Sequence, residues 1–233
     1  ADGKDGVIAW GGDGTVACAF ERSGKDGPAI LPLPGGTMNM LHKQIHGGPL
    51  EWRDCLKAAI EARNKIKVPA GKVGDRTFYV AANVGHLTGL AKSREAVRHG
   101  DVLQAIEALA STDAFDLRTN ILYQLVDHKD VEVSGYATAL AVFVGNPDED
   151  HFDVGRIDPD HPFQLMRTGV EGLFSGWREA EGVEKFATNK VSVDDDRGHQ
   201  LRVTLDGEPC RLPSGSVFER IASAAWALSA RTS

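Results

Sequence analysis

Two short apolar segments, each followed by a glycine-rich turn, constrain the fold of this chain most. Residues 6–10 and 29–33 are continuously apolar, which is typical of strands buried on both faces. The turns at residues 11–15 and 34–39 come directly after them, and each leads into a helix, for which Thr37 is the expected N-cap in the second case. Repeated strand–turn–helix units predict a parallel α/β arrangement.

The pattern changes after residue 63. Residues 50–63 form an amphipathic helix, and the remainder of the chain is dominated by strands. Two helices are expected over residues 90–99 and 101–111, and strands over residues 65–72, 77–84, 120–127, 137–145, 186–193 and 200–205. A run of strands after an α/β opening predicts a second, β-rich domain that begins near residue 64.

Composition excludes several classes of protein. The net charge of −7 argues against general nucleic-acid binding, which needs clustered Lys and Arg. The cysteines Cys18, Cys55 and Cys210 show no metal-ligand spacing and favour a reducing, cytoplasmic setting. The longest apolar runs, residues 137–144 and 221–230, fall short of the roughly 20 residues that a transmembrane helix needs, so no transmembrane segment is expected.

The glycine turns have the chemistry of a phosphate site. Turns at the carboxyl ends of parallel strands bring free backbone N–H groups and helix N-termini together. Two neighbouring turns of this kind suit the polyphosphate of a nucleotide. Asp13 would then stand beside the terminal phosphate, where a carboxylate can hold a metal ion or take a proton from an attacking hydroxyl. A plain structural turn is the alternative at each place.

Three motifs resemble the signatures of the diacylglycerol kinase catalytic family. They are GGDGT at residues 11–15, LPLPGGTMNML at residues 31–41 and VTLDGEP at residues 203–209. They occur in the order of that family, which includes sphingosine kinases, ceramide kinases and bacterial soluble lipid kinases. The second motif favours the lipid-kinase branch over the distantly related NAD kinases.

The resemblance implies two domains. A three-layer α/β nucleotide-binding domain would comprise residues 1–63 and 216–233, and a β-sandwich-like lipid-substrate domain residues 64–215. It implies ATP and magnesium as cosubstrates. It implies Asp13 as the general base, Glu208 as a second catalytic carboxylate, and Asp13 with Asp206 as metal ligands. The residues it assigns to the nucleotide are Gly11, Gly12, Gly14, Thr15, Gly35, Gly36, Thr37 and Asn39.

The function implied is transfer of the γ-phosphoryl group of Mg-ATP to the hydroxyl of a diacylglycerol-like lipid. Such a cytoplasmic enzyme would meet its lipid substrate at a membrane surface, as a peripheral protein. Two alternatives stay open: a kinase for a soluble acceptor, as NAD kinases are, and a non-catalytic module that binds lipid or nucleotide. The oligomeric state is open as well, with a homodimer as one alternative, and no nucleic-acid partner is expected.

The chain departs from the family pattern at two places in the nucleotide-binding domain, and again at residues 149–153, where the family has an aspartate-glycine-x-leucine-aspartate turn. The family has a further N-terminal segment with an asparagine-proline-x-x-glycine turn, so we expect this chain to lack the first part of the nucleotide domain. Cys18 stands where the family has a glutamate three positions after GGDGT, and a thiol supports a metal ion less well than a carboxylate does.

Three other features have structural explanations. His42 and His46 are one helical turn apart and could bind zinc, but no third ligand is evident. The acidic residues 148–153 could hold a cation, although a solvated loop is the favoured interpretation. Asp206 and Gly207 come after an alternating strand, and an Asp-Gly pair at such a place is a strong hairpin signal.

Overall fold

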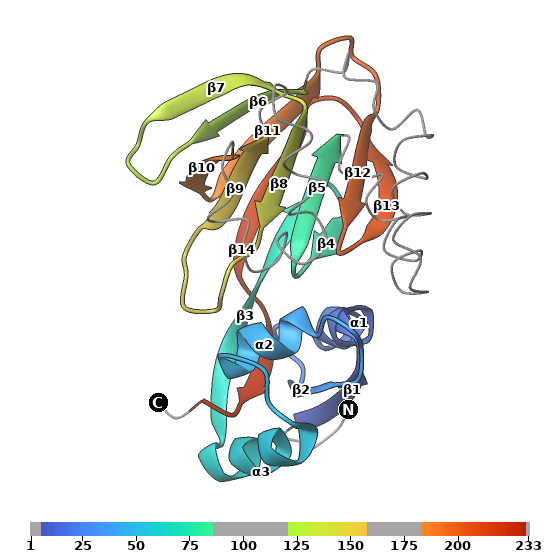
Figure 1. Cartoon of the computed structure of the whole chain (residues 1–233), viewed down its shortest axis with the longest axis vertical. Coiled ribbons are helices and arrows are strands. Elements are labelled where there is room, and N and C mark those ends of the chain that lie inside the picture. Colours follow the sequence, from blue (N-terminus) through green and yellow to red (C-terminus); the bar gives the residue numbers. More distant parts are fainter. Residues whose placement is uncertain (1–5, 86–120, 158–182, 232–233) are drawn as a thin grey trace, which may run out of the picture. The chain divides into compact units, whose positions relative to one another are not determined.

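The computed structural model describes residues 6–85, 121–157 and 183–231 (Figure 1). The chain divides into two compact units, and each unit is built from segments that alternate along the sequence with those of the other. The first unit comprises Ala1–Val80, Val144–His151 and Arg220–Ser233, and the second comprises Ala81–Phe143 and Phe152–Glu219.

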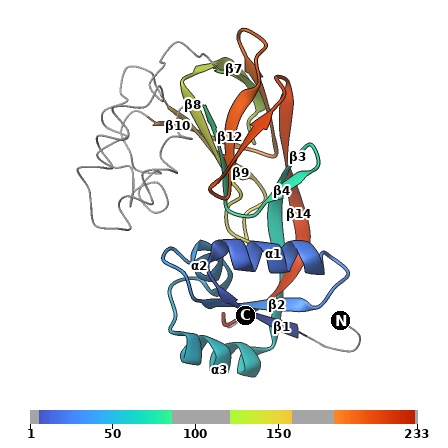
Figure 2. The same ribbon diagram turned by 90° about the vertical axis from the view of Figure 1, so that its right-hand side faces the viewer.

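The first unit is a three-layer α/β structure. Its elements are β1 (Gly6–Gly11), α1 (Asp13–Ser23), β2 (Ala29–Pro34), α2 (Met40–His46), α3 (Trp52–Ala62), β3 (Asn64–Val73), β4 (Arg76–Phe78) and the later part of β14 (Ser216–Ser229). Strands β1 and β2 are parallel, β2 pairs with β14 in parallel, and β3 pairs with β14 and β4. Helices α1 and α2 lie on one face of β1 and β2, and α3 lies on the other (Figure 2). The predicted α/β fold class is confirmed.

Strand β2 is the centre of this core because helices cover both of its faces. Residues 29–33 are all buried. Leu31 and Leu33 pack with Cys55 and Ala59 of α3, and α1 buries an apolar stripe that includes Phe20. Full burial of an aliphatic or aromatic side chain is worth roughly 1.5–3 kcal/mol.

Strand β1 differs from its prediction. Within residues 6–85, 121–157 and 183–231 it pairs with β2 alone, so one edge is open. Val7, Ile8 and Trp10 are 37%, 55% and 58% exposed, although the sequence predicts a strand buried on both faces. The location of the strand is right and its burial is wrong, since an apolar run does not reveal how many neighbours a strand has.

The second unit is a β-sandwich. One sheet joins the first residues of β14 to β11 (Lys190–Asp195), β6 (Ile121–Val126) and β7 (Glu132–Ala137). The other has the order β10 (Val183–Thr188), β9 (Phe152–Ile157), β8 (Ala139–Phe143), β5 (Ala81–Gly85), β12 (Leu201–Leu205) and β13 (Glu208–Leu212). The ring centroids of Tyr123 and Phe186, one from each sheet, are 6.0 Å apart. The predicted β-sandwich-like unit is confirmed.

Several strand predictions need correction. The segments 77–84 and 186–193 are each divided between two strands, because the chain changes sheet within them. Strands β7, β9, β13 and β14 are missing from the prediction. β7 contains a glycine and a serine and is largely exposed, and β13 contains Pro209, so neither has the composition typical of a strand. The helices predicted over residues 90–99 and 101–111 lie outside the described residues.

The units divide at other places than the domain boundaries expected from the sequence. Residues 64–80 lie in the first unit, because β3 pairs with β14 and β4 pairs with β3. The loop over residues 144–151 also belongs there, and the N–H of Val144 donates to the carbonyl of Val80 at 3.0 Å. Its membership could not be read from local patterns, since it depends on contacts with residues far away in the sequence.

The β3–β4 hairpin offers a test of this packing. Gly71 of β3 is paired with Phe78 of β4, and the Phe78 ring fills the space that a Cβ on Gly71 would need. We expect Gly71→Ala to lower the free energy of unfolding by about 1–3 kcal/mol, as overpacking does. The combination with Phe78→Leu should cost less than the sum of the two single changes. Urea unfolding of the three variants measures this, and additive costs would contradict it.

Candidate active site

The first glycine turn leads from β1 into α1 and leaves the start of that helix open. Gly12 is the N-cap residue, with extended backbone and no side-chain capping bond. Asp13 and Gly14 form the first turn, where N–H groups have no partner within the helix. A Cβ on Gly14 would meet no atom within 4 Å, and Thr15 is exposed. The structure therefore leaves room beside the N–H groups of this turn.

The second glycine turn lies directly against the first. The N–H of Gly35 donates to the carbonyl of Gly11 at 3.0 Å. A Cβ on Gly36 would stand 2.6 Å from the Cα of Gly12, and one on Gly35 would stand 2.9 Å from the Cα of Gly11. Only residues without a Cβ allow two backbones to approach this closely. The glycine motifs, 24 positions apart between Gly11 and Gly35, thus form one structural unit.

Asp13 connects the two helices that begin here. Its Oδ1 accepts a hydrogen bond from the N–H of Leu41 at 2.8 Å, so a carboxylate of α1 caps the start of α2. The predicted N-cap role of Thr37 is wrong: α2 begins at Met40, and Thr37 is exposed in the preceding turn. Local sequence favours a nearby hydroxyl and gives no sign of a capping group 28 residues earlier.

Asn39 is the N-cap residue of α2 by position, but its side chain does not cap the helix. Its backbone is left-handed, with φ 49° and ψ 46°. The N–H of Gly36 donates to Oδ1 of Asn39 at 2.8 Å, and Nδ2 of Asn39 donates to the carbonyl of Gly36 at 2.8 Å. The side-chain amide is therefore turned back into the glycine loop.

The third motif lies in the second unit, at the turn between β12 and β13. Asp206 and Gly207 have φ values of 50° and 90°, which confirms the predicted hairpin with a turn of left-handed residues. Oδ1 of Asp206 accepts from the N–H of Ala81 at 3.0 Å, and Glu208 is exposed. The catalytic role of Glu208 and the metal-binding role of Asp206 stay predictions.

Cys18 lies on α1, one turn beyond Thr15. Its side chain is exposed and its thiol is free. The helix buries Val16 and Phe20, so position 18 faces away from the core.

A cluster of His42, His46 and Cys55 was only partly visible in the sequence. Their candidate ligand atoms lie within 4.8 Å of one another and all three residues are buried. Cys55 supplies the third group that the histidine spacing lacked. The signal was its place on the buried face of α3, since Cys55 packs with Leu31 and Leu33 and both histidines bond to the carbonyl of Pro32, the residue between these two leucines.

The hydrogen bonds of this cluster are those of a structural core. The carbonyl of Pro32 accepts from Nδ1 of His42 at 3.1 Å and from Nε2 of His46 at 2.9 Å. Nδ1 of His46 accepts from the N–H of Ala230 at 3.0 Å. Burial lowers the pKa of His46 to about 4 and raises the pKa of Cys55 to about 11. Both ring nitrogens of His46 are therefore engaged by the backbone, one as donor to Pro32 and one as acceptor from Ala230, which argues against a metal site.

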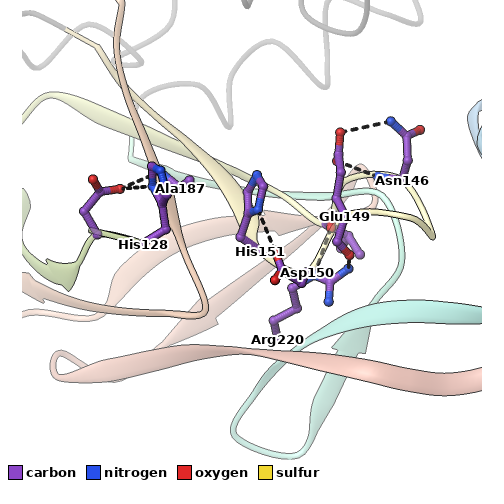
Figure 3. A network of polar contacts seen from close by, with 9 residues as sticks. His128, Asn146, Glu149, Asp150, His151, Ala187 and Arg220 are labelled. Atoms are coloured by element: carbon purple, nitrogen blue, oxygen red, sulfur yellow. Dashed lines mark hydrogen bonds and ion pairs between the residues drawn. The ribbon is translucent and has the colours of Figure 1, made fainter. Parts of the chain in front are cut away.

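The acidic loop before β9 is held by bonds to its own unit (Figure 3). Oε2 of Glu149 accepts from the N–H of Asn146 at 2.8 Å, and Arg220 donates to the carbonyl of Glu149. Asp148 pairs with Arg231 at 2.6 Å. These bonds engage the side chains of Asp148 and Glu149 within the first unit.

Comparison with known proteins finds the same family that the glycine motifs resemble. Residues 1–73 match the family model of the diacylglycerol kinase catalytic domain. This segment is similar in sequence to that catalytic domain. The resemblance found in the motifs is confirmed here, and the matched kinase-family segment contains both glycine turns, Asp13 and α3.

Solved structures share the whole fold. Three structures of proteins from Bacillus anthracis strain Sterne match, two provisionally named diacylglycerol kinases and one named a diacylglycerol kinase outright. Two of them superpose with TM-scores of 0.69 and 0.67 at 16% and 15% identity, and cover 96% and 97% of this chain and 77% and 78% of theirs. The third has a TM-score of 0.61 at 14% identity, with 96% and 76% covered. At this identity the likeness establishes the fold.

Among the residues that the structure describes, no helix combines the length and the apolar character needed to cross a bilayer.

The contact between the glycine turns can be tested by adding a methyl group. We expect Gly36→Ala to lower the free energy of unfolding by about 1–3 kcal/mol, since its Cβ meets backbone that cannot give way as a flexible side chain would. Gly14→Ala is the matched control: its Cβ enters open space, and alanine favours the helix. Chemical denaturation compares them, and equal stability of the two variants would contradict the contact.

The buried His46 should make the first unit sensitive to acid. Its folded pKa of about 4 lies below the ordinary 6.5, so the unfolded chain binds the proton first. The stabilisation is complete above pH 6.5 and is lost as the pH falls towards 4, by up to about 3 kcal/mol.

Thermal unfolding monitored by tryptophan fluorescence measures the acid sensitivity of the first unit, because Trp10, Trp52 and Trp226 all lie in it. His46→Gln should flatten the pH dependence of the midpoint between pH 6.5 and 4. His199→Gln, at a histidine that is 70% exposed, should leave it close to wild type. An unchanged slope in His46→Gln would show that His46 is not responsible.

Proposed function

We propose that this protein transfers the γ-phosphoryl group of Mg-ATP to the hydroxyl of a diacylglycerol-like lipid at a membrane surface. The observation that carries the proposal is the family match of residues 1–73, which includes the two interlocked glycine turns and Asp13. Such a transfer needs positioning and charge neutralisation more than covalent chemistry from the protein.

The open first turn of α1 is the proposed phosphate site. Its N–H groups and the positive end of the helix dipole favour anions. The space beside Gly14 leaves room for a phosphate group, and the hydroxyl of Thr15 is exposed nearby. With 11 residues, α1 is long enough to carry a substantial dipole.

Asp13 fits the two roles proposed for it. Its Oδ1 is held by the N–H of Leu41, which fixes the carboxylate at the start of α1 and α2. Asp13 is only partly buried, so its carboxylate also reaches solvent. In the proposed reaction the lipid oxygen bonds to the γ-phosphorus as the bond to the β–γ bridging oxygen breaks, and Asp13 takes the hydroxyl proton.

A carboxylate of this kind also fits Mg²⁺, which proteins hold with one or two carboxylates beside substrate phosphates. Magnesium would neutralise the charge of the phosphates. Asp13 is the residue of the first unit proposed to hold it.

Two substitutions of Asp13 separate its chemistry from its structural bond. Asp13→Asn keeps an oxygen that accepts from Leu41 but removes the charge, so the fold should be retained while turnover falls by about 10²–10⁴-fold. Asp13→Ala should lose both the turnover and the hydrogen bond from Leu41, so its stability should fall as well. Transfer of labelled phosphate from Mg-ATP into mixed lipid micelles measures turnover, and thermal unfolding measures the fold.

The result also decides between acceptors. Label in a lipid, lost in Asp13→Asn, supports the proposal and identifies the lipid class. Label in a soluble acceptor such as NAD, without lipid, would favour the second alternative. Nucleotide or lipid binding without transfer would favour a non-catalytic module. Turnover retained in Asp13→Asn would remove Asp13 from the mechanism.

A further inference from the structure

Asn39 has the features of a residue that shapes the site, not those of a direct ligand. An amide side chain has one oxygen that accepts and two N–H groups that donate. Asn39 directs both ends to Gly36, as acceptor from the N–H and as donor to the carbonyl, each at 2.8 Å. This pair of hydrogen bonds to one residue fixes the loop between residues 36 and 39 in a closed form.

The same turn determines where Asp13 is held. A residue at the N-cap usually accepts from the second or third N–H of its helix with its own side chain. The left-handed backbone of Asn39 turns the side chain away, and the N–H of Leu41 is left for Asp13, 2.8 Å away. The orientation of the Asp13 carboxylate therefore depends on the conformation of Asn39.

The backbone of the second turn is engaged in the same way. The N–H of Gly35 donates to Gly11 and that of Gly36 donates to Asn39. Neither group is available to a phosphate without breaking a bond within the protein. Helix α2, with only seven residues and its first turn capped by Asp13, adds little further attraction for an anion.

We infer that Asn39 is a positioning residue that holds the second glycine turn against the first and so fixes Asp13, while the first turn of α1 contacts the phosphates. The inference rests on the proposed function and refines it, because it assigns the second glycine motif to shape instead of to nucleotide binding.

Asn39→Gly is the decisive variant, since glycine tolerates the left-handed backbone and removes only the side-chain bonds. In the full-length protein labelled with ¹⁵N, amide exchange at Gly36 should rise at least tenfold and that at Leu41 severalfold. Met38→Gly is the matched control: it adds similar backbone freedom to the loop and should leave both rates near wild type.

Kinetics distinguish positioning from binding. Asn39→Gly should lower kcat about tenfold or more and change the KM for ATP by less than about threefold, because uniform binding is kept and the alignment of the base is lost. Asn39→Asp keeps the acceptor for Gly36 and should recover part of kcat. A tenfold rise in KM with unchanged exchange at Leu41 would overturn the inference, since Asn39 would then be a ligand.

A titration with Mg-ATP separates this inference from the proposed function. We expect the amide signals of Asp13 and Gly14 to shift while the side-chain amide signal of Asn39 keeps its hydrogen-bonded position. If no signal shifts and no transfer occurs, the proposed function fails, and exchange at Leu41 still decides whether Asn39 holds Asp13. Unchanged exchange there in both Asn39→Gly and Asn39→Asp would refute the positioning role.

Discussion

The contact on which the site depends is the one between two backbones at Gly12 and Gly36. No side chain fits between them, because a Cβ on Gly36 would be only 2.6 Å from the Cα of Gly12. This contact brings the starts of α1 and α2 within hydrogen-bond distance, and the carboxylate of Asp13 can then reach Leu41. The glycines thus have a structural function that does not require a ligand, and the proposed phosphate binding is built on top of it.

The carbonyl of Pro32 is a second polar group that stabilises this part of the first unit. Pro32 lies inside β2 and cannot donate to the strand ladder. Its carbonyl accepts hydrogen bonds from His42 and His46, and these bonds join α2 to the central strand. His46 also accepts from the backbone of Ala230 near the end of β14. Buried polar groups are stable only when they are paired in this manner, so the histidines serve packing where their spacing alone resembled a metal motif.

The sequence was informative where local chemistry decides the structure. The alternation of residues 201–205 and the Asp206–Gly207 pair predicted a hairpin that is present. The apolar runs with their glycine turns predicted β1, β2 and the helix α1 between them. It was misleading where distant partners decide. The cap of α2 comes from Asp13, the third member of the histidine cluster comes from α3, and β1 has one neighbour among the described strands. None of these contacts can be predicted from a short window of the sequence, because each depends on a residue far away along the chain.

Strand β14 has a consequence for how the protein is made. Its residue Ala227 pairs with Ile30 of β2, and β3 pairs with the same strand, so the middle of the first unit's sheet comes from a strand far from β1 and β2 in the sequence. Ribosomes deliver the N-terminal segment first, and domains fold in the order in which they emerge. Here residues 6–73 are synthesised more than a hundred residues before β14, and their sheet cannot close until β14 is present. Until then its apolar strands lack their central partner, and unpaired apolar strands of this kind are prone to aggregate.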